Sequence, residues 1–420
     1  MSLIFPKHPE GDGSRILVIG DAVAPTGFAR VLHSIFDRLS QKYEVHHLGV
    51  NYSGDPHDSS WKIYPAGDAR GFHRIAPLIA KLQPQLIFSL GDLWVSMQIA
   101  GIVARLDTKI PAVAYFPVES DPVEPDAMVH LLRGSDVLVT YTSFGASETN
   151  LAIQRAREAH PDLPVRELLI VPHGVDRRVF YPLESGGPGA HKRSRLAARE
   201  RLFPGRADLR DAFIVLNANR NQPRKRIDVT MEAFAVFARD KPAGVKLYLH
   251  MARQDAGWDI QRLAKRLGIA DRLLVTKDTN EYPSESVEQL NLIYNACDVG
   301  VNTSCAEGWG LVTFEHAATG AAQIVPRHTS QIELWEGKAE LVGPQFSLTT
   351  ENILTKAYHV MPADVAAAMQ RLYTDPEHCR RLGDAALHRT SEARFDWDHI
   401  AARWDQIFSS ALIRQPKPPT

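Results

Sequence analysis

The feature that most limits the possible fold is an alternation of short apolar runs with amphipathic stretches, which occurs twice along the 420 residues. Runs of this kind, separated by helix-length segments, are typical of parallel sheets covered by helices. The runs begin at Ile16, Val45, Leu86, Ala112, Val137 and Leu168, and then at Phe213, Val245, Leu273, Val299 and Ala322. Because a chain of this length exceeds the size of one ordinary core, the sequence predicts an α/β protein with two Rossmann-like domains and a cleft between them.

The stretch between the two series has the composition of a connection. Residues 184–201 are rich in Gly, Pro, Ser and charged side chains, which favours a solvated linker over a packed element. We therefore expect an N-terminal domain at residues 1–200, with the linker at about 184–208, and a C-terminal domain at residues 209–394. Residues 395–413 predict a final amphipathic helix, which either completes the second domain or crosses back to the first.

Charge and cysteine content exclude several classes of protein. The chain has 48 Lys and Arg against 49 Asp and Glu, so its overall field gives no reason to expect nucleic acid or an anionic membrane as a partner. The 3 cysteines lack metal-ligand spacing and argue against a disulfide framework and a zinc site. The N-terminus has no signal-peptide core, and the most apolar stretch, residues 86–104, is interrupted by Gly91 and Asp92. We expect a cytoplasmic protein with at most peripheral contact at the inner membrane face.

The loop after the first apolar run lies at the edge of the predicted sheet where ligands usually bind. Thr26 is placed to cap the following helix, and Gly27 stands beside it. The loop from Asp21 to Gly27 is not a GxGxxG sequence and lacks the spacing that clamps a dinucleotide. No nicotinamide cofactor is expected in this half.

A second loop carries more chemistry, because two carboxylates, Glu307 and Glu315, bracket a glycine-rich turn between a strand and a helix. Glycine lets the backbone approach a ligand, and amides at a helix N-terminus attract phosphate. Carboxylates beside such a site suit the hydroxyls of a ribose or a sugar. For two glutamates alone, the favoured interpretation is that Glu315 is an exposed helix residue and that Glu307 interacts with the dipole at the helix N-terminus. The amides concerned are those of Gly308, Trp309, Gly310, Leu311 and Val312.

Two cations follow the first strand of the same domain. Arg220 and Lys225 leave the carboxyl end of the strand that begins at Phe213, so they can reach the same sheet edge as the glycine-rich turn. Cations aimed at a diphosphate stabilise the charge that grows on it as a glycosidic bond breaks. The alternative is a solvated basic loop before the next helix.

Together, in this order, these features resemble glycosyltransferase family 4, a retaining group with the GT-B fold of two facing Rossmann-like domains. Its E-x7-E motif is matched by Glu307 and Glu315, and its Arg and Lys pair by Arg220 and Lys225. Its glycine loop is matched by Gly27. The resemblance covers nearly the whole chain and includes PHGVD at residues 172–176 and LIYNACDVGVNTS at residues 292–304.

The resemblance implies a role for each matched residue. Glu315 would hold the donor ribose, Glu307 the hydroxyls of the donor sugar, and the amides near Gly308–Val312 the distal phosphate. Arg220 and Lys225 would neutralise the diphosphate, so the reaction would need no divalent ion or other cofactor. The final helix would cross back to the N-terminal domain. The pair Asp396 and Asp398 is better explained as helix capping than as a metal site.

One departure concerns the acceptor side. Many members of the family have a histidine after the fourth strand of the first domain, whereas this segment reads AYFPVESDPVEP. We expect Glu119 or Asp121 to line the acceptor pocket, with Asp92 beside them; a capping or turn role is the alternative for each.

The resulting hypothesis is a retaining, metal-independent, hexosyltransferase-like enzyme (EC 2.4). It would move a sugar from a UDP- or GDP-sugar to a hydroxyl of a glycan, lipid-linked, protein or small-molecule acceptor. One alternative is a non-catalytic nucleotide-sugar binding subunit, which would bind a donor without turnover. Another is a sugar-nucleotide epimerase or hydrolase on the same fold, which would need a general base that the sequence does not suggest.

Overall fold

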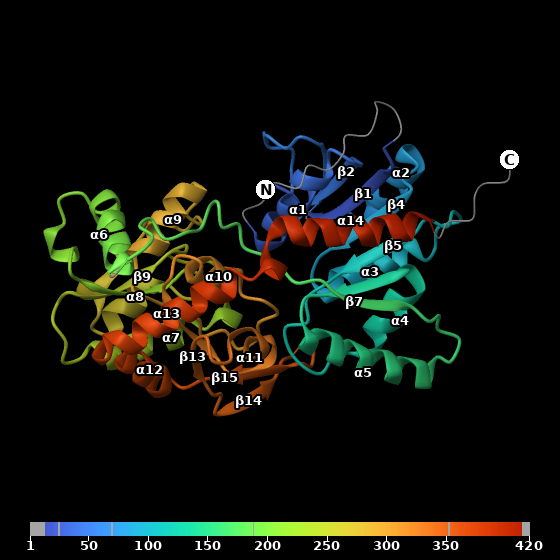
Figure 1. Cartoon of the computed structure of the whole chain (residues 1–420). Coiled ribbons are helices and arrows are strands. Elements are labelled where there is room, and N and C mark those ends of the chain that lie inside the picture. The colour runs from blue at the N-terminus through green and yellow to red at the C-terminus, as the bar shows by residue number, and fades with distance from the viewer. Residues whose placement is uncertain (1–12, 24–25, 69, 188, 352, 414–420) are drawn as a thin grey trace. The chain divides into compact units, whose positions relative to one another are not determined.

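The computed structural model describes residues 13–23, 26–68, 70–187, 189–351 and 353–413. The chain forms two compact units (Figure 1). The first unit holds the described residues up to His173 together with those from Trp397 onward, and the second holds Gly174–Asp396. Within the described residues, no helix has both the length and the apolar character needed to cross a membrane.

The first unit is built on a seven-stranded parallel sheet with the strand order β3-β2-β1-β4-β5-β6-β7. Most of its strands are buried apolar runs, as expected for a sheet covered on both faces. The sequence predicted all of them except β3, a four-residue edge strand that ends in proline. The strands are β1 (Arg15–Asp21), β2 (Glu44–Val50), β3 (Lys62–Pro65), β4 (Leu86–Leu90), β5 (Ala112–Tyr115), β6 (Val137–Thr140) and β7 (Glu167–Ile170).

The helices of the first unit include the final helix of the described chain. They are α1 (Gly27–Leu39), α2 (Phe72–Leu82), α3 (Leu93–Val103), α4 (Pro125–Gly134), α5 (Ser143–Ala159) and α14 (Trp397–Ile413). Thr26 Oγ1 caps α1 by accepting a hydrogen bond from the Ala29 amide at 3.1 Å. The final helix α14 runs beside α1 (Figure 1), where Phe408 stacks on Phe36 with ring centroids 6.2 Å apart.

The second unit has a six-stranded parallel sheet with the order β10-β9-β8-β11-β12-β13, and a separate antiparallel hairpin of β14 and β15. The five strands from β8 to β12 coincide with the predicted runs, whereas β13 and the hairpin were not predicted. The strands are β8 (Phe213–Asn217), β9 (Val245–Leu249), β10 (Leu273–Val275), β11 (Val299–Val301), β12 (Ala322–Pro326), β13 (Glu340–Val342), β14 (Phe346–Thr349) and β15 (Lys356–His359).

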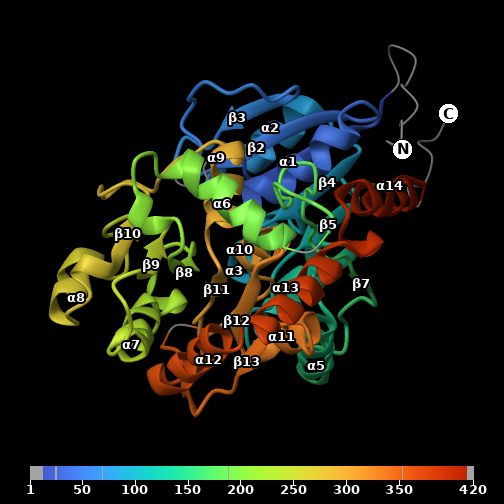
Figure 2. The same ribbon diagram turned by 60° about the vertical axis from the view of Figure 1, so that its left-hand side comes forward.

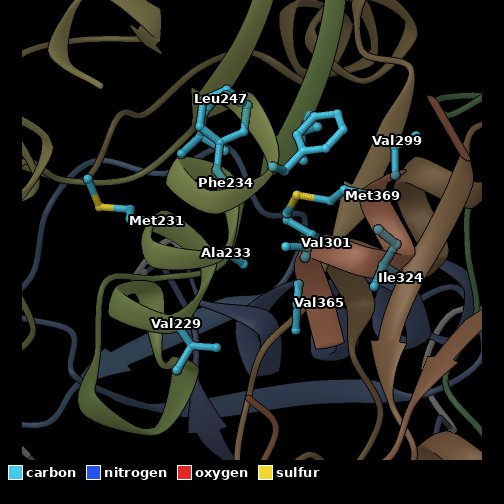
Figure 3. Close-up of a cluster of buried hydrophobic side chains, with 14 of the residues drawn as sticks. Val229, Met231, Ala233, Phe234, Leu247, Val299, Val301, Ile324, Val365 and Met369 are labelled. Atoms are coloured by element: carbon cyan, nitrogen blue, oxygen red, sulfur yellow. The ribbon is translucent and has the colours of Figure 1, made fainter. Parts of the chain in front are cut away.

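Alternate residues along β8 and β9 supply two cores on opposite faces of this sheet, in keeping with the two-residue period of a strand. On one face, Phe234 of α7 and Met369 of α12 pack with Leu247 and Val301 (Figure 3). On the other face, Ile293 of α9 packs with residues of β8. The helices are α6 (Ala190–Leu202), α7 (Ile227–Ala238), α8 (Ile260–Arg266), α9 (Val287–Ala296), α10 (Leu311–Ala317), α11 (Thr329–Trp335), α12 (Pro362–Thr374) and α13 (Pro376–Thr390).

The region predicted as a solvated linker differs in the structure. The two units divide after His173, so residues 174–200 belong to the second unit, and residues 190–202 form helix α6 beside α9 (Figure 2). The reason is a buried arginine: the Arg199 guanidinium bonds to Asp298 Oδ2 at 2.7 Å and to the Ala296 carbonyl at 2.8 Å. Because this stretch is highly charged, its composition did not indicate that it forms a packed helix.

Candidate functional site

The loop between β11 and α10 carries the predicted donor residues at the carboxyl edge of the second sheet. Gly310 precedes α10 with φ +87°, a left-handed conformation that favours glycine. Its carbonyl accepts hydrogen bonds from the Thr313 and Phe314 amides, at 3.0 and 3.2 Å. Gly308 precedes it in the loop, and Leu311 and Val312 open the helix, so the residues predicted to surround a phosphate are contiguous around one tight turn.

Glu307 lies in this loop as the centre of a buried ionic cluster. Its Oε2 accepts hydrogen bonds from Lys225 Nζ at 2.5 Å and Ser304 Oγ at 3.2 Å, and the Arg224 guanidinium lies 3.7 Å from Oε1. Burial raises the pKa of the Glu307 carboxyl, but the charges of Lys225 and Arg224 outweigh burial and lower it to about 2. The carboxylate is therefore ionised and paired.

Glu315 is also buried, on the helix that follows the loop. Only 2 % of the residue is exposed, and its Oε2 accepts a hydrogen bond from the Tyr294 hydroxyl at 2.9 Å. Tyr294 belongs to α9. The interpretation of Glu315 as an exposed helix residue is therefore wrong, and both glutamates of the pair are fixed by neighbours from other elements.

The two predicted cations have different partners in the structure. Lys225 lies beside Glu307, whereas Arg220 is half exposed and its Nε bonds to Asp255 Oδ2 at 2.6 Å. The cation that joins Lys225 is Arg224, which also donates to the Ala306 carbonyl at 2.7 Å. Both residues belong to the 3-10 turn Pro223–Lys225, and that turn directs them to the loop. The proline in NQPRKR was the signal that could have identified this turn.

A second group of residues, which was not predicted from the sequence, holds the loop through its backbone carbonyls. Four consecutive side chains at the start of α11 each hydrogen-bond to a loop carbonyl: His328 to Ser304 at 2.8 Å, Thr329 and Ser330 to Glu307 at 3.2 and 2.6 Å, and Gln331 to Trp309 at 3.1 Å. We call residues 328–331 the loop clamp. Thr329 has φ +45°, a strained conformation for a β-branched residue. Polar residues directly after the β12 run were the available signal.

Trp309 has a structural side chain. It is buried, and its ring packs on Phe314 and Phe395 with centroids 4.7 and 5.7 Å apart. Any contact of Trp309 with a donor would therefore use the backbone of the loop.

The acceptor-side candidates lie in the first unit. Asp92 precedes α3, and Glu119 and Asp121 occupy the loop between β5 and α4. Gly27 opens α1. Because these residues follow β4, β5 and β1, they belong to the carboxyl edge of one parallel sheet.

The same edge also holds a buried histidine, which lies in the predicted segment 172–176. His173 Nδ1 is 2.8 Å from the Tyr115 hydroxyl, and burial lowers its pKa to about 3, so the ring is neutral. At the start of α14, Asp398 Oδ1 pairs with Arg38 Nε at 2.5 Å.

Comparisons with known proteins find similarity to glycosyltransferases. Residues 248–406 match the family model described as "Glycosyl transferase-like". D-inositol 3-phosphate glycosyltransferases of Streptomyces coelicolor and Stackebrandtia nassauensis are 28% and 30% identical over 70% and 68% of this chain. The chain spans 60% and 56% of the length of these two relatives.

Solved structures match over almost the whole chain. Sucrose-phosphate synthase from Thermosynechococcus elongatus has a TM-score of 0.72 at 18% identity, covering 96% of this chain and 100% of that one. Anabaena HepE in complex with UDP-glucose has a TM-score of 0.65 at 16% identity, covering 94% and 99%. At such identities the likeness concerns the fold, and the predicted GT-B architecture is confirmed.

Proposed function

Because the chain has the GT-B fold and is related to the group 1 glycosyltransferases, we propose that it transfers a sugar from a nucleoside diphosphate donor to an acceptor hydroxyl. In this proposal, transfer retains the anomeric configuration and needs no metal ion. UDP-sugars are the first donors to test, since one structural neighbour is described with UDP-glucose bound, and GDP-sugars are the second.

One observation carries the proposal. Lys225 and Glu307 form a buried ion pair, and Glu307 lies in the loop that leads to the helix of Glu315. Burying charges is costly unless they are paired, and apolar side chains of similar volume often stabilise a protein at least as well as a buried ion pair, so the pair points to a function. Lys225 and Arg224 supply two cations to a diphosphate, and the two glutamates supply acceptors for hydroxyl groups. This combination suits a nucleotide sugar, which has both kinds of group.

Each donor residue then contacts a different part of the nucleotide sugar. Glu315 accepts hydrogen bonds from the ribose, Glu307 accepts them from the sugar, and the backbone from Gly308 to Val312 approaches the distal phosphate. Lys225 and Arg224 stabilise the charge that develops on the departing diphosphate. Arg220 joins them by exchanging Asp255 for a phosphate oxygen.

The reaction proceeds through an oxocarbenium-like transition state. The bond from the anomeric carbon to the diphosphate oxygen breaks as the acceptor oxygen attacks from the same face. The departing phosphate takes the acceptor's proton, so no protein base is needed. The protein contributes orientation and charge stabilisation.

The acceptor binds the first unit beside Asp92, Glu119 and Asp121. Gly27 is a further residue proposed to contact the donor. Carboxylates and turn backbone suit a hydroxyl-bearing acceptor. The relatives are named for D-inositol 3-phosphate, so this compound is the first acceptor to test, ahead of glycan, lipid-linked and protein acceptors.

A two-step experiment tests the proposal. Thermal-shift screening of UDP- and GDP-sugars identifies the donor, because a ligand that binds only the folded state raises the melting temperature. Nucleoside diphosphate release is then measured with the acceptor panel for wild type and Lys225→Met. Donor binding and transfer in wild type, with transfer lost in the variant, support the proposal. Donor binding without turnover on any acceptor would indicate a binding subunit instead.

A further inference from the structure

The hydrogen bond from Tyr294 to Glu315 joins two side chains that are almost completely inaccessible. The exposed fractions are 1 % for Tyr294 and 2 % for Glu315, and the oxygen atoms are 2.9 Å apart. The tyrosine comes from α9, which precedes β11, and the glutamate from α10, which follows it. The contact therefore links the two helices on either side of the donor loop.

Neighbouring rings hold Tyr294 in place. Its ring lies 5.5 Å from that of Phe180 and 5.6 Å from that of His316, between centroids. Two torsions place the ring and the hydroxyl oxygen of a tyrosine, so these contacts fix the position of the Tyr294 hydroxyl oxygen. A hydrogen bond from a fixed donor in turn fixes the orientation of the Glu315 carboxylate.

We infer that Tyr294 is a positioning residue for ribose recognition: it holds Glu315 in the rotamer from which the carboxylate accepts hydrogen bonds from the ribose hydroxyls of the donor. This inference rests on the proposed function. Tyr294 itself does not touch the donor. Its contribution is to reduce the orientational freedom that Glu315 would otherwise lose on binding.

Removing single ribose hydroxyls from the ligand tests this role directly. The affinities of UDP and 2′-deoxy-UDP are measured by calorimetry for wild type, Tyr294→Phe and Glu315→Gln. A hydrogen bond to a charged group predicts that wild type prefers UDP by about tenfold or more. In Tyr294→Phe this preference falls by at least about threefold, toward that of Glu315→Gln, while the affinity for 2′-deoxy-UDP changes little. A merely structural role would weaken both ligands equally.

The first unit supplies a matched control. The Tyr43 hydroxyl, also on a buried residue, donates to Asp405 Oδ1 at 2.6 Å. Tyr43→Phe therefore removes the same kind of bond, and we expect the wild-type preference for UDP to persist. In the double variant of Tyr294→Phe with Glu315→Gln, the preference should equal that of Glu315→Gln alone.

The outcomes separate this inference from the proposed function. An unchanged preference in Tyr294→Phe would overturn the positioning role, as would equal wild-type affinities for UDP and 2′-deoxy-UDP. If wild type binds neither UDP nor GDP, the proposed function itself fails. Because phenylalanine keeps the packed ring, far-ultraviolet circular dichroism should show that the Tyr294→Phe variant is folded.

Discussion

Lys225 Nζ lies 2.5 Å from Glu307 Oε2, and neither residue has more than a tenth of its surface exposed. The lysine follows β8 and the glutamate follows β11, two strands that are neighbours in the sheet although 82 residues separate the two side chains. The parallel topology brings the two loops to one edge. This ion pair is the observation on which the proposed donor site of the second unit depends.

Glu307→Gln should lower transfer by about a hundredfold or more, because the amide cannot pair with Lys225 or accept hydroxyl hydrogen bonds as a carboxylate does. It also leaves a buried ammonium without its counter-charge, which costs about 3 kcal/mol of the free energy of unfolding. Steady-state rates and urea unfolding measure the two effects. Wild-type transfer rates in this variant would rule out Glu307 as a donor residue.

The same ion pair should make the free energy of unfolding depend on pH in the acid range. The pKa of Glu307 is about 2 in the folded chain against an ordinary value of 4.5. Because the folded value is the lower one, this group's stabilisation is complete above the unfolded pKa and is lost as the pH falls toward 2. Between about pH 5 and pH 3, the free energy of unfolding should therefore fall more in wild type than in Glu307→Gln. Equal slopes in the two proteins would contradict the depressed pKa.

Ser330→Ala tests the loop clamp. The hydroxyl donates to the Glu307 carbonyl at 2.6 Å, so its loss should cost about 1 kcal/mol of stability and let the loop move. Looser positioning of Glu307 should raise the KM for the donor and lower kcat. Together these changes should lower kcat/KM by roughly tenfold. Ser391→Ala is the matched control, since that hydroxyl donates to the Leu387 carbonyl at 2.7 Å on α13. Equal kinetics in the two variants would show that the clamp does not position the donor loop.

The difference between Arg220 and Arg224 shows what sequence reasoning could reach at this site. Lys225, Glu307 and Glu315 were identified because they follow strands that the apolar runs predict, and because they match the ordered motifs of a known family. Which arginine turns inward depends on the 3-10 turn at Pro223–Lys225, a local geometry that the spacing does not encode. The loop clamp depends on contacts between segments about 20 residues apart, which only the folded sheet brings together.

Most of the fold was predictable because apolar runs mark its strands. The prediction failed where tertiary contacts override local composition. Buried strands leave a clear apolar signal, whereas β3 and β13 are edge strands that offer only the short apolar pairs Ile63–Tyr64 and Leu341–Val342. All four residues of the hairpin strand β14 are exposed, so no alternation of buried and exposed residues indicates it. Helix α6 was hidden because Arg199 is buried against Asp298, a partner 99 residues away.

Arg199→Met should show that α6 is packed. It leaves the Asp298 carboxylate with one cation fewer in a buried environment, at a cost of about 3 kcal/mol in the free energy of unfolding. UDP affinity should stay unchanged, because neither residue contacts the donor loop. Arg201→Met, an exposed position on the same helix, should change stability by less than about 0.5 kcal/mol. Similar values for the two variants would mean that α6 is a solvated segment after all.

Trp404→Ala tests the attachment of the final helix to the first unit. Trp404 is completely buried, and its ring lies 5.0 Å from that of Phe88 and 4.8 Å from that of Tyr115, between centroids. Truncating a buried aromatic leaves a cavity and costs about 3–5 kcal/mol. Urea unfolding, followed by proteolysis to locate the unfolded segment, should show a less stable first unit in which α14 is cleaved early. Ile413→Ala, at the exposed end of the same helix, should leave both measurements near wild type, because its side chain is 81% exposed. If Trp404→Ala were as stable as Ile413→Ala, α14 would not be an integral part of this unit.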